Sequence, residues 1–255
     1  RIKNKLIVMS GKGGVGKSTV AVNLAYGLAL EGKRVGLLDV DIHGPSTAKM
    51  TGIEGQGLGY DVSGEVKPIQ IHDNFFVLTI ASMLDDPDKP VVWRGPLKIG
   101  AIKQFLQDIT WPELDYLVVD CPPGTGDEPL TIAQFLEDVK GGGTVIVSTP
   151  QDIALLDARK TLSFAGMLKL PVLGIIENMA TFVCPHCGEA IDIFKSGGIE
   201  KAIADFGVEL LGKIPMDSHI GESGDEGKPY IYHYNKKEGA EVFREIVKKV
   251  MDKTE

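Results

Sequence analysis

A glycine-rich loop at Gly11–Ser18 (GKGGVGKS) carries the residue types that bind nucleotide phosphates. It has the spacing G-x-x-x-x-G-K-[ST] and lies between an apolar run, Lys5–Ser10, and a segment with helical spacing of apolar residues, Ser18–Leu30. Its backbone N–H groups and the helix N-terminus are expected to face the phosphates. We expect Lys17 to contact the β- and γ-phosphates and the Ser18 hydroxyl to bind Mg²⁺. The predicted phosphate-binding residues are Gly11, Gly13, Gly14, Val15, Gly16, Lys17, Ser18 and Thr19.

A carboxylate at the end of another predicted strand could hold the metal of a bound nucleotide. Asp120 ends the apolar run Tyr116–Asp120 and is followed by CPPGTGD. We expect Asp120 to hold Mg²⁺ through a water, and Gly124 to present its N–H group to the γ-phosphate and so to sense it. The alternative is an aspartate that only caps the next turn.

Two more aspartates lie at the carboxyl end of the predicted strand Lys33–Asp39. Asp39 and Asp41 are two residues apart, so in an extended chain their side chains point to the same side. Ligands in such folds bind at the carboxyl ends of the strands. We expect Asp41 to orient the attacking water and Asp39 to lie closer to Mg²⁺ or to a lysine. An Asx turn before Gly44 is the alternative.

A second lysine, Lys12, precedes the phosphate-binding lysine in the same loop. Lys12 is less well placed than Lys17 to reach the γ-phosphate of a nucleotide bound by its own loop. It could instead reach the nucleotide of a partner across a two-fold axis, like an arginine finger supplied in trans. For a lysine taken alone, a solvated loop residue is the alternative.

The sequence Cys184-Pro-His-Cys187 is a candidate metal site. Thiolates at positions i and i+3 can point at one metal while backbone N–H groups turn toward the sulfurs. The chain has three cysteines and no second CxxC, so one chain supplies two of the four ligands that such a site needs. A symmetric dimer would supply four. A bridging Zn²⁺, a redox-active CxxC and a pair of surface thiols are the alternatives.

The elements that must position these residues follow the period of an α/β protein. Besides the runs named above, we predict buried strands at 76–80, 144–148 and 172–177, the last continuing to Asn178, and helices at 97–106 and 237–251. Runs that are apolar throughout are typical of parallel strands covered on both faces. We therefore expect a doubly wound, mostly parallel sheet flanked by helices, as one domain over residues 1–255, with an insertion at about 181–198 that carries the CxxC.

Composition narrows the function. The chain has 255 residues, a net charge of −8 and 43% hydrophobic residues, which is typical of a globular protein with a full core. The negative charge argues against non-specific binding to nucleic acid. No apolar run is long enough to span a bilayer, no signal peptide is recognised, and the mixed charges of the last helix favour packing on the core. Three cysteines do not make a secreted disulfide framework, so we expect a cytoplasmic protein.

Several segments together resemble the deviant phosphate-loop ATPases of the MinD/ParA class. Within that class the chain is most similar to the Mrp/ApbC-type iron–sulfur carrier ATPases, whose eukaryotic relatives are the Nbp and Cfd scaffold ATPases. The segments that carry the resemblance are KGGVGKST (12–19), DVDIHGPS (39–46), WRGP (93–96), LDYLVVDCPPGTGDEPLT (114–131), STPQDIALLDARK (148–160) and ENMATFVCPHCG (177–188).

The resemblance implies a homodimer in which Lys12 is the signature lysine that crosses the interface. It implies ATP in preference to GTP, with Asn178 after a late strand and Pro215 in a later loop holding the adenine. It also implies slow ATP hydrolysis and a [4Fe–4S] cluster shared by Cys184 and Cys187 of two chains, handed on to apo iron–sulfur proteins. The rival prediction is a MinD/ParA-like ATPase for positioning or partition, with a structural Zn²⁺ at the CxxC.

Overall fold

The computed structural model describes residues 2–42, 44–60, 64–83, 95–135, 141–184, 186–187, 189–191, 193 and 198–255. Two residues of the WRGP segment, Trp93 and Arg94, lie outside the described residues, as do parts of 181–198.

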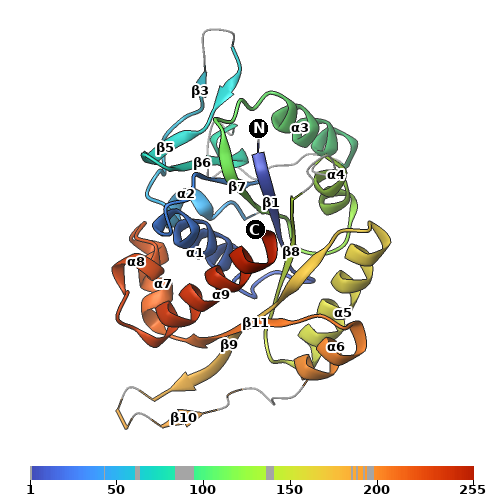
Figure 1. Cartoon of the computed structure of the whole chain (residues 1–255). Coiled ribbons are helices and arrows are strands. Elements are labelled where there is room, and N and C mark those ends of the chain that lie inside the picture. The colour runs from blue at the N-terminus through green and yellow to red at the C-terminus, as the bar shows by residue number, and fades with distance from the viewer. Residues whose placement is uncertain are drawn as a thin grey trace.

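In the described residues, a sheet of nine strands forms the centre of the molecule (Figure 1). The order is β10-β9-β8-β1-β7-β2-β6-β5, and β11 pairs with β9. The parallel strands are β1 (Ile2–Met9), β2 (Val35–Asp39), β6 (Phe75–Thr79), β7 (Leu114–Asp120), β8 (Gly141–Ser148), β9 (Val172–Val183) and β11 (Leu210–Met216). Two short strands, β5 (Ile69–His72) and β10 (Ala190–Ile191), pair antiparallel with β6 and β9. The predicted doubly wound, mostly parallel α/β fold is confirmed.

Helices cover both faces of this sheet (Figure 1). The longer ones are α1 (Lys17–Leu30), α3 (Gly95–Gln107), α4 (Asp127–Phe135), α5 (Asp152–Met167), α6 (Gly198–Phe206) and α9 (Glu238–Thr254). The shorter elements are α2 (Thr47–Met50), α7 (Ser218–Asp225), α8 (Tyr230–His233), the 3₁₀ helix Ile80–Met83, and a hairpin of β3 (Gly59–Tyr60) and β4 (Val66–Lys67). Helices α1, α8 and α9 pack on one face, and α3 to α6 on the other.

The strand β1 shows why the apolar runs are continuous. Leu6 and Val8 belong to the core beneath α1 and α9, whereas Ile7 and Met9 belong to the core beneath α3 and α4. Side chains of a strand alternate between the faces, so a strand covered on both sides must be apolar at every position. All four side chains are buried. This packing fixes the point at which β1 ends and the phosphate loop begins.

Most predicted elements match, with shifted ends. The predicted helix at 97–106 lies within α3, and the predicted strand at 144–148 forms the end of β8. The strand predicted to end at Asn178 instead continues to Val183, so the predicted insertion begins inside β9 and contains β10, which pairs with the end of β9. The strand β11 was not predicted, and Pro215 lies within it rather than in a loop. The single domain over 1–255 stays a prediction.

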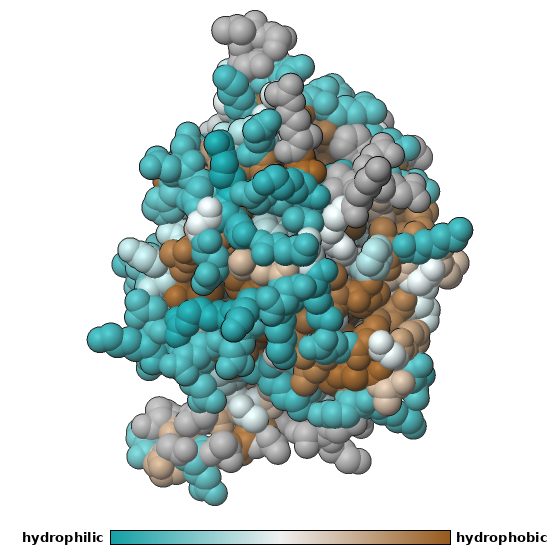
Figure 2. Space-filling model, viewed as in Figure 1, coloured by the Kyte–Doolittle hydropathy of each residue, from teal (hydrophilic) through white to brown (hydrophobic). Residues whose placement is uncertain are grey.

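The last helix packs as its pattern predicts. Phe243, Ile246, Val247 and Val250 are buried in the core beneath α1, with Val242 and Met251 packed at its edge. Figure 2 shows hydrophilic side chains over the outer face of α9. Among the helices that the structure describes, none combines the length and apolarity needed to cross a bilayer.

Candidate functional site

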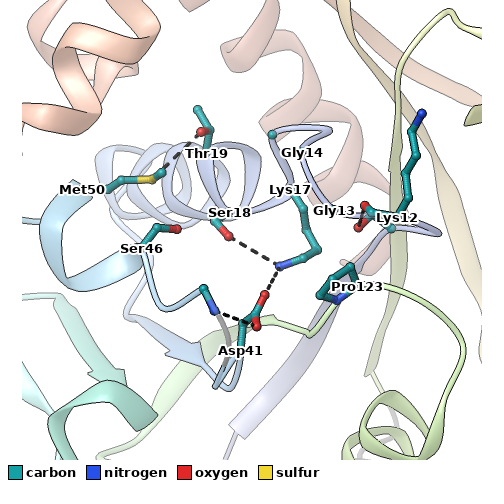
Figure 3. A pocket seen from close by; sticks show the side chains of 13 residues that line it. Lys12, Gly13, Gly14, Lys17, Ser18, Thr19, Asp41, Ser46, Met50 and Pro123 are labelled. Atoms are coloured by element: carbon teal, nitrogen blue, oxygen red, sulfur yellow. Dashed lines mark hydrogen bonds and ion pairs between the residues drawn. The ribbon is translucent and has the colours of Figure 1, made fainter. Parts of the chain in front are cut away.

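The glycine-rich loop joins β1 to α1 and forms one wall of a pocket of about 380 Å³. Gly14 and Gly16 have φ angles of 79° and 80°, in the left-handed region that glycine adopts without strain. Gly16 also occupies the N-cap position of α1, so the loop presents the start of that helix to the pocket. The pocket is lined by Ser10, Lys12, Gly13, Gly14, Gly16, Lys17, Ser18, Thr19, Asp41, Gly44, Ser46, Met50 and Pro123 (Figure 3).

Lys17, which lines this pocket, forms a buried ion pair with Asp120. The Lys17 Nζ atom lies 2.5 Å from Oδ1 of Asp120, and the two side chains are 6% and 0% exposed. Burial disfavours the charge on Lys17, but the attraction of Asp120 outweighs it and raises the pKa of Lys17. Burial also raises the pKa of Asp120, against the effect of Lys17. The second oxygen of Asp120, Oδ2, is buried and has no hydrogen-bond partner among the described residues.

The two aspartates after β2 have different surroundings. Asp41 lines the pocket, with Oδ2 3.9 Å from Lys17 Nζ and Oδ1 accepting a hydrogen bond from the Gly44 N–H group (Figure 3). Asp39 is fully buried, and its two oxygens accept hydrogen bonds from the N–H groups of Asp41 and Thr47. Burial and the charge of Asp120 raise the pKa of Asp39 to about 7. Asp39 therefore shapes the loop as in the Asx-turn alternative, and only its ionised form attracts Lys17.

Two predicted phosphate-binding glycines contact protein rather than the pocket. A Cβ atom on Gly11 would lie 2.4 Å from the backbone oxygen of Asp157, so this glycine permits the close approach of α5. Gly124 has a φ angle of 94°, and its N–H group donates a 2.8 Å hydrogen bond to the Ser10 carbonyl. In this structure the Gly124 N–H group is thus committed to the chain, whereas its neighbour Pro123 lines the pocket.

Lys12 does not turn toward the phosphate side of its own pocket. Its Nζ atom donates a 3.2 Å hydrogen bond to Oε1 of Gln151, the residue at the N-cap position of α5. Figure 3 shows the Lys12 ammonium directed away from Lys17 and Asp41. Gln151 lies in the segment STPQDIALLDARK that carries the resemblance, but its residue type and spacing alone do not mark it as a site residue.

The two predicted adenine-binding residues lie on adjacent strands. Asn178 lies within β9, and its Nδ2 atom donates a 2.9 Å hydrogen bond to the carbonyl of Val15 in the glycine-rich loop. Val15 is itself buried, so it contacts the protein interior and not the pocket. Pro215 lies in β11, which pairs with β9. The contacts of Asn178 and Pro215 with adenine stay predictions.

The cysteine knuckle lies where β9 turns into β10. Cys184 is half-buried, and His186 and Cys187 are exposed. Hydrogen bonds from the backbone of Cys187 and then of His186, together with the Cys187 side chain, lower the pKa of Cys184. Across the described residues, no cluster of three or more His, Cys, Asp or Glu side chains could hold a metal ion. Cys121, by contrast, is buried beside Asp120, and burial raises the pKa of its thiol.

Comparison with known proteins identifies relatives along the whole chain. The family model described as "ParA: NUBPL iron-transfer P-loop NTPase" matches residues 1–251. An iron-sulfur cluster carrier protein of Methanocaldococcus jannaschii is 49% identical over 255 residues, which are 100% of this chain and 86% of the relative. A protein of the same description from Methanococcus maripaludis is 45% identical over 253 residues, covering 99% and 86%.

Two solved structures place the fold. A nucleotide-binding protein from Archaeoglobus fulgidus, solved in complex with ADP and containing cobalt, is 39% identical with a TM-score of 0.78, covering 91% of this chain and 89% of that one. The cell division ATPase MinD of Pyrococcus furiosus is 23% identical with a TM-score of 0.71, covering 98% and 99%. The second likeness concerns the fold alone.

Proposed function

Because the chain belongs to the family of NUBPL-type iron-transfer P-loop NTPases, we propose that it is a homodimeric ATP-dependent carrier of iron–sulfur clusters. It binds ATP, hydrolyses it slowly, holds a [4Fe–4S] cluster between two chains and hands the cluster to apo iron–sulfur proteins of the cytoplasm. The observation that carries this proposal is the pairing of a phosphate-binding pocket with a two-thiolate knuckle that is incomplete in the described residues of one chain.

The proposed binding of ATP and Mg²⁺ rests on the buried ion pair of Lys17 and Asp120. Ser18 and Asp120 would hold Mg²⁺, since Asp120 Oδ2 is buried without a partner among the described residues and an anionic oxygen is the ligand that Mg²⁺ prefers. When bound, Mg²⁺ supplies positive charge to the β- and γ-phosphate oxygens. Lys17 contacts the same oxygens, and Asp41, which lines the pocket, orients the attacking water.

The dimer supplies what one pocket lacks. In the proposed dimer Lys12 leaves Gln151 and contacts the γ-phosphate in the partner chain, where a cation stabilises the charge of the transferring group.

Asn178 and Pro215 hold the adenine from β9 and β11. The N–H group of Gly124 leaves the Ser10 carbonyl when the γ-phosphate is present.

The proposed binding of an iron–sulfur cluster rests on the chemistry of Cys184. Because backbone N–H groups lower the pKa of Cys184, this thiol loses its proton at a lower pH than an ordinary cysteine does. The thiolate is the form that binds iron or zinc. Two chains related by a two-fold axis bring four thiolates together. Exposure of Cys187 gives an acceptor protein access to the cluster.

Anaerobic reconstitution tests the proposal directly. We would measure iron, sulfide and zinc per dimer in the unaltered protein, in Cys184→Ala, in Cys187→Ala and in the matched control Cys121→Ala, whose thiol is buried away from the knuckle. The expected result is about four irons and four sulfides per dimer, lost in the first two variants and kept in the third. Stoichiometric zinc that iron and sulfide cannot displace, or no metal at all, would contradict the carrier function.

A further inference from the structure

The strand β9 runs from the sheet, where it lies between β8 and β11, to the cysteine knuckle. Its first half pairs with β8, from Val172 to Glu177, and its last residues pair with β10. In Figure 1 the end of β9 and β10 extend beyond the rest of the sheet. A strand that touches both the nucleotide loop and the thiols could transmit a change at one to the other.

At its centre β9 is fastened to the glycine-rich loop. The Asn178 amide donates its 2.9 Å hydrogen bond to the Val15 carbonyl, and both side chains are buried. The loop leaves no space beside this amide, because a Cβ atom on Gly16 would lie 2.2 Å from Asn178 Nδ2. The same Cβ would lie 4.0 Å from the terminal carbon of Met179. A shift of the loop on binding phosphate therefore acts on Asn178 directly, and Met179 is the next residue along the strand.

Immediately after this anchor the strand is interrupted. Met179 has a φ angle of 56°, in the left-handed region that residues with a Cβ rarely adopt. Opposite it, β11 advances by two residues, from Ile214 to Met216, while β9 advances by four, from Asn178 to Phe182. Two extra residues thus bulge from β9 at this point, and such bulges redirect the strand that follows them.

Beyond the bulge the strand pairs regularly up to the thiols. Phe182 pairs with Met216 on one strand and with Ile191 on the other. The N–H group of Cys184 donates a 2.9 Å hydrogen bond to the carbonyl of Glu189, which closes the hairpin at the knuckle. The segment from Phe182 to Cys184 is therefore held by backbone pairing, and the irregular backbone lies between it and Asn178.

We propose that the left-handed bulge at Met179 is the joint through which the nucleotide state of the glycine-rich loop sets the position of Cys184 and Cys187, and with it their affinity for metal. Met179 is a positioning residue, and this inference rests on the proposed carrier function. Binding free energies are reciprocal, so metal at the knuckle changes the affinity for nucleotide by the same factor.

The test is a titration of the full chain with Co²⁺, whose thiolate absorption reports binding at the cysteines, with and without Mg-ADP. We expect the two dissociation constants of the unaltered protein to differ by about fivefold or more. Met179→Asn retains the ratio of these two dissociation constants, because asparagine tolerates the left-handed region. Met179→Val brings the ratio close to one, because a β-branched residue does not tolerate that region. Both variants remove the methionine side chain, so the pair isolates the backbone.

A matched control separates strain from coupling. Lys169 also has a positive φ angle, 55°, but lies in the turn after α5, so Lys169→Val has the same kind of strain and retains the ratio. The proposed role of Met179 is wrong if Met179→Val binds Mg-ADP and keeps the full ratio of the two Co²⁺ dissociation constants. It is also wrong if Lys169→Val loses as much of that ratio as Met179→Val does. Equal Co²⁺ affinity with and without Mg-ADP in the unaltered protein would overturn the coupling and leave the carrier function standing. Co²⁺ that does not bind the cysteines at all would overturn both.

Amide hydrogen exchange of the unaltered, metal-free protein gives a measurement that needs no variant. We expect Mg-ADP to change the exchange of residues 180–191 and to leave the β3–β4 hairpin unchanged. Exchange at 180–191 that Mg-ADP does not alter would overturn the proposal even if Met179→Val fails to fold.

Discussion

The Lys17 ammonium and the Asp120 carboxylate lie 2.5 Å apart in the interior, and Lys17 also lines the pocket beside the glycine-rich loop. Removing one partner leaves the other charge buried, which usually destabilises a protein by about 3 kcal/mol or more. We therefore expect Lys17→Ala to lower the free energy of unfolding by about 3 kcal/mol, and the double variant Lys17→Met with Asp120→Asn to recover most of the loss. Urea unfolding of the three proteins measures this. Equal losses in the single and double variants would show that the pair is not coupled.

The buried carboxyl of Asp39 makes stability depend on pH. Because its pKa is raised to about 7 in the folded chain, the folded state holds a proton that the unfolded state has released. This group therefore lowers the free energy of unfolding as pH rises from about 4 to about 7. We expect Asp39→Asn to gain stability relative to the unaltered protein over that interval, measured by urea unfolding in Mg²⁺-free buffer. A difference that stays constant from pH 4 to 7 would show that Asp39 is ionised throughout.

The place of Lys12 can be tested by mixing two inactive variants. Lys12→Ala is expected to lower ATP hydrolysis on the order of a thousandfold while keeping ATP binding, and Lys17→Ala to abolish binding at its own pocket. A mixed dimer has one intact pocket that receives Lys12 from the Lys17→Ala chain. Activity that reappears on mixing supports action in trans. Two variants that stay inactive together would favour action within one chain.

Gly11 is needed for packing, and its neighbour Gly13 provides the control. A Cβ atom on Gly11 would overlap the backbone of Asp157, whereas none of the described atoms lies within 4 Å of a Cβ on Gly13. Overpacking of this kind typically costs about 1–3 kcal/mol. We expect Gly11→Ala to unfold at a lower urea concentration than Gly13→Ala. Similar midpoints would show that α5 moves away without loss.

The thiols differ in reactivity because their surroundings differ. Backbone hydrogen bonds lower the pKa of Cys184, whereas burial raises the pKa of Cys121. In the metal-free protein we expect iodoacetamide to modify Cys184 at neutral pH, and Cys121 only after unfolding. Peptide mass spectrometry across a pH series measures both. Modification of Cys121 in the folded protein would contradict its burial.

The sequence by itself determined the phosphate-binding loop, the carboxylate that follows β7 and the α/β class. Lys17 and Ser18 are fixed by a local spacing at the start of a helix, and Asp120 by the end of a buried apolar run. Such features are local because a turn and a helix start depend on residues a few positions apart. The last helix was predictable for the same reason, since its apolar positions recur along one face.

The tertiary structure decided what depends on pairing between distant segments. β9 continues past the polar residues Glu177 and Asn178 because β11 pairs with it, and β11 contains Gly212 and Pro215, which individually favour turns. Only the fold could show that Asp39 is buried and holds its own loop, and that the Gly124 N–H group is committed to Ser10. The partners of Lys12 and Asn178 lie 139 and 163 residues away along the chain. Contacts at such separations are set by how whole elements pack, and no local pattern encodes them.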